Sequence, residues 1–149
     1  MIDLTAFDKA LLAPTAVLIL WSLLVLLWVV VTRFPAFTKA GIDIKIAPAG
    51  SRYVEVESMM PANVNWKSHN FTHLMEQPTL FYAVVMVLTL AGDTEGVSVA
   101  LAWAYVLLRI LHSLWQSLLN TLPVRVGLYA LSTLCLLGLA IKALLVTLV

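Results

Sequence analysis

The chain has 149 residues, of which 62% are hydrophobic and only 11% are charged, with a formal net charge of +1 and a mean hydropathy of +0.98. Soluble globular domains carry about 25% charged residues, so this composition excludes an ordinary soluble domain. No basic block of the kind that binds nucleic acid is present, and a single cysteine, Cys135, excludes an intrachain disulfide and a cysteine metal cluster. The composition therefore predicts a protein embedded in a membrane.

Apolar runs of spanning length follow one another along the chain. A helix that crosses a bilayer needs about 20 mostly apolar residues, and the segments that qualify are 13–32, 68–91, 97–119 and 126–149. The residues ahead of the first segment include Asp3 and Asp8 and lack the basic start of a signal peptide, so we expect a retained helix. The sequence thus predicts an all-α membrane protein with a single domain over 1–149, a bundle of four transmembrane helices.

The connection at 33–67 is the one region with soluble character. It holds most of the basic residues, namely Arg33, Lys39, Lys45, Arg52 and Lys67, whereas the connection after the second span holds Asp93 and Glu95. By the positive-inside rule, this loop and the turn before Arg125 face the cytoplasm and both termini lie outside. The compact connections suggest a bacterial inner membrane. The alternation of apolar and polar residues over 53–57 suggests a short strand-like piece.

Polar side chains form a stripe on each of the two middle spans. Glu76 lies in the second span and Arg109 in the third, and charges in hydrocarbon are costly and usually functional. Steps of three and four residues place the members of each stripe on one helical face. One stripe is His69, His73 and Glu76, and the other is Arg109, His112, Gln116 and Asn120.

Glu76 and Arg109 are expected at matching depth. At a rise of about 1.5 Å per residue, they lie roughly 14 and 16 Å from the cytoplasmic ends of their helices. We therefore predict that they pair at the floor of a cleft that opens toward Arg125. The alternative is a buried ion pair that only fixes the helix register. Pro78 removes a backbone hydrogen bond and is expected to free a carbonyl near Leu74.

The second span also has a spacing that suits a metal. His69, His73 and Glu76 lie at i, i+4 and i+7, which can present two imidazoles and a carboxylate to one ion. Arg109 at the same depth would repel a cation, so no metal site is predicted.

Two stretches resemble one known family. The run from Asn70 to Tyr82, NFTHLMEQPTLFY, resembles the second helix of the membrane-associated proteins in eicosanoid and glutathione metabolism, the MAPEG family. The run RILH at 109–112, followed by Asn120, Pro123 and Arg125, is similar to the third helix and turn of that family. The resemblance covers about residues 65–130 and the layout of four helices.

The resemblance implies a homotrimer that binds glutathione between neighbouring subunits near the cytoplasmic face. It implies that Arg125 lies near the sulfur and is the catalytic residue, because the thiolate is the nucleophile. The residues expected to bind glutathione are Asn70, His73, Glu76, Arg109, His112, Gln116 and Asn120. The sequence departs from the microsomal transferases at Gln116, where they carry Tyr, at His69, where they carry Arg, and at His73, where they carry Asn.

The resulting functional hypothesis is a glutathione-dependent transferase or peroxidase that acts on lipophilic electrophiles, with membrane lipids as surroundings and glutathione as co-substrate. One alternative is a MAPEG-like protein without glutathione chemistry that binds a lipid or another anionic ligand, or has a structural role. Another is a small proton-coupled exporter that uses Glu76. Against the exporter, Arg109 at the same depth would hold Glu76 ionised.

Overall fold

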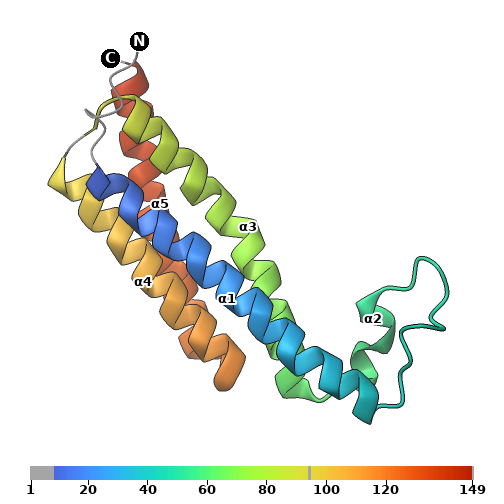
Figure 1. The fold of residues 1–149 in the computed structure, drawn as a ribbon. Helices are drawn as coiled ribbons and strands as arrows, with labels where there is room; N and C mark the ends of the chain where they lie inside the picture. Colours follow the sequence, from blue (N-terminus) through green and yellow to red (C-terminus); the bar gives the residue numbers. More distant parts are fainter. Residues whose placement is uncertain (1–8, 94, 149) are drawn as a thin grey trace.

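Four long helices make up most of the molecule. The computed structural model describes residues 9–93 and 95–148 (Figure 1). The long helices are α1 (Lys9–Lys39), α3 (Ala62–Leu90), α4 (Gly96–Leu118) and α5 (Leu122–Leu148), and all are long and apolar enough to cross a membrane. Even the 23 residues of α4, the shortest, extend about 35 Å, against a hydrocarbon core of about 30 Å. The predicted all-α bundle of four spanning helices is confirmed.

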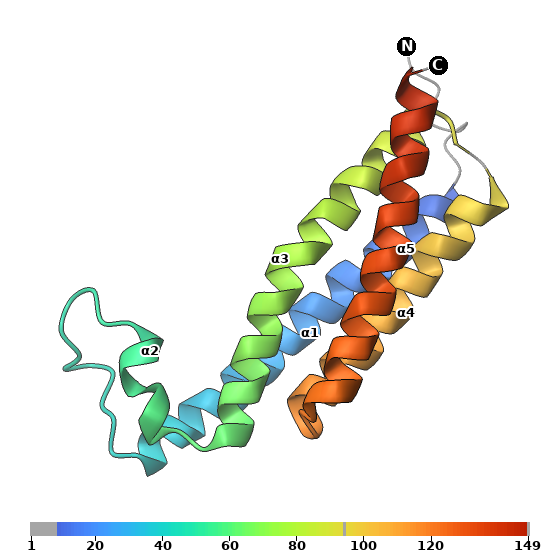
Figure 2. The same ribbon diagram turned by 180° about the vertical axis from the view of Figure 1, so that it is seen from behind.

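The helices pack so that the loop after α1 and the turn after α4 lie at the same end of the bundle (Figures 1 and 2). Helix α1 packs on α3 and α4, α3 also packs on α4 and α5, and α4 packs on α5. Figures 1 and 2 show the loop between α1 and α3 and the short turn between α4 and α5 at the same end of the bundle. The beginning of α1 and the end of α5 lie toward the opposite end.

The bundle has a narrow core and a wide apolar exterior. Leu18 and Val25 of α1 are buried at a spacing of seven residues, and the Phe81 and Tyr105 rings stack at 4.4 Å between α3 and α4. Most other leucines of α1 point outward, and Leu27 is 60% exposed. Outward leucines suit contact with lipid chains rather than water. A bundle of this kind has little apolar surface to bury internally.

Two helices extend further than the apolar runs indicated. Helix α1 continues through Pro35 to Lys39, and α3 begins at Ala62, so the polar loop shrinks from the predicted 33–67 to 40–61. Hydropathy locates the part of a helix that lies in hydrocarbon, but the helical backbone continues into polar residues beyond it. Gly41 ends α1 with a φ of 71°, and the amide of Ile42 donates to the carbonyl of Phe37.

The strand-like piece expected at 53–57 is wrong. Residues Tyr53–Val56 form one turn of α-helix, α2, and Glu57–Met59 follow as a 3-10 turn, η2. Among the described residues no second strand is available to pair with this segment, and an unpaired strand leaves its backbone groups without partners. A helical turn satisfies them locally and brings Tyr53 and Val56, three residues apart, to one face.

Gly138 allows α5 to approach α4 closely. A Cβ at this position would lie 3.2 Å from Cδ1 of Leu101. We expect Gly138→Leu to lower the free energy of unfolding by about 1–3 kcal/mol, because the larger side chain forces the helices apart. Gly127→Leu in the same helix is the control, since a Cβ at that position would have no neighbour within 4 Å. Thermal unfolding in detergent measures both, and equal losses would contradict the expectation.

Candidate functional site

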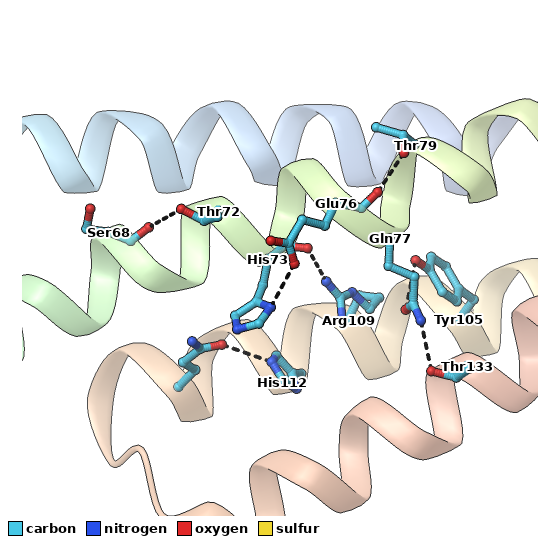
Figure 3. A network of polar contacts seen from close by, with 11 residues as sticks. Ser68, Thr72, His73, Glu76, Gln77, Thr79, Tyr105, Arg109, His112 and Thr133 are labelled. Atoms are coloured by element: carbon cyan, nitrogen blue, oxygen red, sulfur yellow. Dashed lines mark hydrogen bonds and ion pairs between the residues drawn. The ribbon is translucent and has the colours of Figure 1, made fainter. Parts of the chain in front are cut away.

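Arg109 is the centre of the polar contacts between α3 and α4. Helix α4 turns Arg109, His112 and Gln116 into the bundle, and Arg109 is 0% exposed. Its Nη2 donates to the backbone carbonyl of His73 at 2.7 Å (Figure 3). Its Nε and Nη1 are buried and have no hydrogen-bond partner. Buried polar groups are nearly always paired, so these unpaired donors mark Arg109 as an unusual residue.

Glu76 contacts His73 rather than Arg109. Its carboxylate lies 3.2 Å from Nδ1 of His73, and its side chain is 60% exposed (Figure 3). Glu76 and Arg109 are both among the described residues, and they form no ion pair with each other. The predicted direct pair is therefore wrong within one chain. The backbone of α3 faces Arg109, and the Glu76 side chain points toward the surface instead.

Arg109 binds a carbonyl next to the one that Pro78 was expected to free. Pro78 has no N–H for the carbonyl of Leu74, yet Arg109 binds the carbonyl of His73. Helix α3 nevertheless runs without interruption from Ala62 to Leu90. Proline is tolerated in membrane helices because neighbouring groups supply the missing partners. Pro78 therefore does not end the helix that carries the site.

His112 connects α4 to the beginning of α5. Its Nδ1 lies 3.1 Å from the backbone carbonyl of Arg125, and its Nε2 lies 2.9 Å from the side-chain amide of Gln116. The oxygen and nitrogen of a Gln side-chain amide are interchangeable by a flip of the amide group. With the amide nitrogen of Gln116 turned toward the ring, a neutral His112 donates from Nδ1 to the carbonyl of Arg125 and accepts at Nε2 from Gln116. Gln116 is buried and orients His112, so its amide is engaged within the chain.

Asn120 holds the side chain of Arg125. It lies in the turn after α4 with a φ of 54°, a left-handed conformation that Asn adopts more readily than most residues. Its backbone N–H donates to the carbonyl of Trp115 at 2.7 Å, and its Oδ1 accepts from Nη1 of Arg125 at 2.8 Å. The turn therefore determines where the predicted catalytic guanidinium lies.

A cavity of about 180 Å³ lies where α3, α4 and α5 meet near this turn. It is lined by His73, His112, Arg125, Val126 and Tyr129. The structure thus brings three predicted site residues together. The centre of the Tyr129 ring lies 5.9 Å from that of the His112 ring and 5.5 Å from the Arg109 guanidinium carbon. Tyr129 was not predicted, although its position one helical turn after Arg125 would have indicated it.

Asn70 lies inside the bundle. Its amide nitrogen donates to Oγ of Ser113 at 2.7 Å and to Oγ of Ser117 at 3.0 Å, and it is 0% exposed. Ser113 also accepts from the indole of Trp21 on α1 at 3.0 Å. Both hydrogens of the Asn70 amide are thus used within the chain. The serines were missed, although their spacing of four residues on α4 indicates a shared face.

His69 lies outside this cluster. Its Nε2 is 2.5 Å from a carboxylate oxygen of Glu57 in η2, so it fastens the polar loop to α3. Over residues 9–93 and 95–148, no group of three His, Cys, Asp or Glu side chains is placed to hold a metal ion. The i, i+4, i+7 spacing in α3 therefore does not bring its three members together.

The sequence profile of the MAPEG family matches residues 11–145, which include nearly all of the four long helices. The chain belongs to the MAPEG family. Searches of the curated proteins and of the solved structures found no match. As a member of MAPEG with four spanning helices, the chain is an integral, multi-pass membrane protein.

Within this MAPEG chain the predicted site residues fall into two groups. His73, His112 and Arg125 line the cavity, with Asn120 holding Arg125 and Glu76 beside His73. Asn70, Arg109 and Gln116 are buried in contacts between helices. That these residues bind a ligand stays a prediction.

Asn70 is expected to stabilise the fold. Asn70→Ala removes the hydrogen bonds to Ser113 and Ser117, and such bonds in membrane proteins contribute about 0.6 kcal/mol on average and up to about 1.7 kcal/mol. We therefore expect a lower unfolding temperature in detergent. Asn63→Ala, nearer the beginning of α3 and exposed, is the matched control and should leave that temperature unchanged. An unchanged unfolding temperature for Asn70→Ala would contradict this role.

Proposed function

We propose that this MAPEG protein is a glutathione-dependent transferase or peroxidase that acts on lipophilic electrophiles. The observation that carries the proposal is the cavity beside Arg125, in a chain of a family named for glutathione metabolism. The cavity is lined by residues close to the turn between α4 and α5, and Figure 1 shows this turn at the end of the bundle that also carries the polar loop. A water-soluble co-substrate would reach the cavity from that end. Its lining combines a guanidinium, two imidazoles and a phenol.

These residues fit an anionic tripeptide. Arg125 and His73 can donate to carboxylates, since guanidinium and imidazole N–H groups are the usual partners of such anions. Both ring nitrogens of His112 are engaged with Arg125 and Gln116, so His112 shapes the cavity. Arg109, whose guanidinium carbon lies 5.5 Å from the ring centre of the lining residue Tyr129, has two buried nitrogens without partners and adds positive charge. Glu76 is exposed beside His73 and suits an ammonium group. The cationic side chains and the carboxylate of Glu76 thus match the carboxylates and the ammonium group of glutathione.

Glutathione would supply a thiol that reacts as the thiolate. Arg125 would favour the thiolate, because a nearby positive charge stabilises the charged form. Asn120 would keep the guanidinium in place through its hydrogen bond to Nη1. The phenol of Tyr129 would provide the aromatic hydroxyl that the buried Gln116 does not.

The cavity of one chain is too small for the whole tripeptide. Its 180 Å³ falls below the about 300–1,000 Å³ that small-molecule sites usually occupy. A neighbouring subunit would complete it, which supports the homotrimer that the family resemblance implies. Native mass spectrometry of the detergent-solubilised protein reads the number of subunits directly.

A separate apolar groove supports a lipophilic substrate. It measures about 500 Å³ between α3 and α5, and Leu80, Val84 and Leu137 are among its lining residues. Gln77 and Thr133, which are hydrogen-bonded at 2.8 Å, also line it. We infer that an electrophile dissolved in the bilayer approaches along this groove.

The basic residues of the loop between α1 and α3 support a cytoplasmic location for the end of the bundle that carries this loop. Both termini would then lie outside, as in a bacterial inner-membrane protein.

Arg125→Met is the decisive variant. We expect it to reduce kcat/KM for conjugation at least about tenfold, because a lost charge-stabilising donor costs about that much or more. The ultraviolet absorbance of bound thiolate should fall in parallel. Lys45→Met, which also removes one positive charge but from a loop position that lines neither cavity, is the control and should retain both signals. Full activity in Arg125→Met would contradict the assigned role.

Absence of glutathione binding would favour the second candidate function. The amide nitrogen of Asn70 and the amide of Gln116 are engaged within the chain, which supports a MAPEG protein that binds a lipid or another anionic ligand without glutathione chemistry. Titration calorimetry with millimolar glutathione separates the two. No heat of binding would overturn the transferase, and a co-purified ligand seen by intact mass spectrometry would then support the alternative.

Asn120 is expected to act as a positioning residue. Asn120→Gly keeps the left-handed turn without strain but removes the acceptor for Arg125. We expect a lower kcat with KM for the electrophile little changed. Asn120→Asp tolerates the same backbone conformation and still accepts from Arg125, so it should restore activity. Equal activity of both variants would contradict the assignment.

A further inference from the structure

A second cavity lies between the end of α1 and the polar loop, away from the site around Arg125. It measures about 440 Å³, within the about 300–1,000 Å³ range of small-molecule sites. Leu26, Val30 and Phe34 form its α1 wall, and Ile42 and Ile44 line it from the loop. Apart from two arginines and a serine, its lining is almost wholly apolar. The cavity is therefore an apolar groove that also carries the cationic side chains of Arg33 and Arg52.

The groove extends from the membrane interior to the membrane surface. Leu26 and Val30 belong to the apolar run of α1, and Arg33 ends that run. From Leu26 to Arg33 the helix rises about 10 Å. A molecule that lies along the groove would have one end in hydrocarbon and the other at the polar boundary. A bilayer lipid already occupies this range of depths.

Arg33 brings a charge to the groove that no described carboxylate neutralises. Its Nη2 donates to the hydroxyl of Ser68, its guanidinium carbon lies 3.8 Å from the centre of the Tyr53 ring, and its buried Nε has no hydrogen-bond partner. It forms no ion pair with any described residue. The carboxylate of Glu57, on the neighbouring turn, is engaged with His69.

Arg52 supplies a second cation at the same groove. Its side chain is exposed, and within residues 9–93 and 95–148 it makes neither an ion pair nor a side-chain hydrogen bond. Two arginines without acidic partners create a local positive field beside an apolar channel. Charge complementarity therefore favours an occupant with an anionic head and an apolar tail.

The loop around the groove also exposes large apolar side chains. Ile46 is 81% exposed, and Ile44 and Val54 are more than half exposed. Such side chains next to the exposed Arg52 are typical of segments that lie in the headgroup region of a bilayer. The loop that forms one wall of the groove is thus itself suited to contact lipid.

We propose that this groove binds an anionic phospholipid of the surrounding bilayer, with an acyl chain against α1 and the phosphate beside Arg33 and Arg52. The proposal is independent of glutathione chemistry. A bound lipid would join the polar loop to α1 by filling the space between them. The two arginines give the site a preference for anionic over zwitterionic headgroups.

Native mass spectrometry tests the proposal on the full chain released from nanodiscs that contain equal amounts of phosphatidylglycerol and phosphatidylcholine. We expect preferential retention of phosphatidylglycerol. Arg52→Gln should reduce that retention about fivefold, as expected for one basic residue near a membrane surface. Lys45→Gln is the matched control, because Lys45 lies in the same loop but does not line the groove.

A second variant tests the apolar part of the site without changing charge. Ala47→Trp fills the groove from the loop side and should also reduce phosphatidylglycerol retention. Circular dichroism checks that each variant remains helical. Equal losses in Arg52→Gln and Lys45→Gln, or equal retention of both lipids by the unaltered chain, would overturn the proposal. Retention of added fatty acid but not phosphatidylglycerol would overturn it as well.

Discussion

The hydrogen bonds of Asn70 are the constraint on which the arrangement of the helices depends. The outer surface of each helix is as apolar as lipid, so helices in a bilayer gain little by burying leucines against one another. Asn70 of α3 binds Ser113 and Ser117 of α4, and Ser113 also binds Trp21 of α1. Directional bonds among three helices determine how each is rotated about its axis. They thereby decide which residues face inward.

That rotation determines the character of the site. One helical turn after Asn70, the carbonyl of His73 faces Arg109, and the side chain of Glu76 is left at the surface. The positive charge is therefore deep and fixed, while the negative charge is accessible. A ligand or a second subunit that approaches this face meets Glu76 first. The separation of the two charges is thus a result of backbone orientation, and it gives the proposed site both an acidic and a basic side.

Much of the fold could be predicted from the sequence, because a bilayer demands long apolar helices and leaves few alternatives. The inward face of α4 also followed from the spacing of Arg109, His112 and Gln116. The predicted pairing of Glu76 with Arg109 was wrong. The position of a residue around a helix gives only the approximate direction of its side chain, and it does not show that a backbone carbonyl, here that of His73, will accept the hydrogen bond of Arg109. The short strand was wrong because alternation within one segment says nothing about whether a partner strand exists. Tyr129 was missed because its role depends on how α5 packs.

The turn between α4 and α5 limits the lengths of chain that the fold can accept. Adding or deleting one residue at 119–121 would displace the left-handed Asn120 and shift the beginning of α5 relative to α4. Arg125 and Tyr129 would then leave the cavity, and Asn120 could no longer reach the guanidinium. The number of residues between Arg109 and Arg125 is therefore constrained by the geometry of the site. The loop segment 45–50, of which only Ala47 lines the groove beside α1, sets no such spacing, so insertions and deletions among related chains should accumulate there and not in the turn.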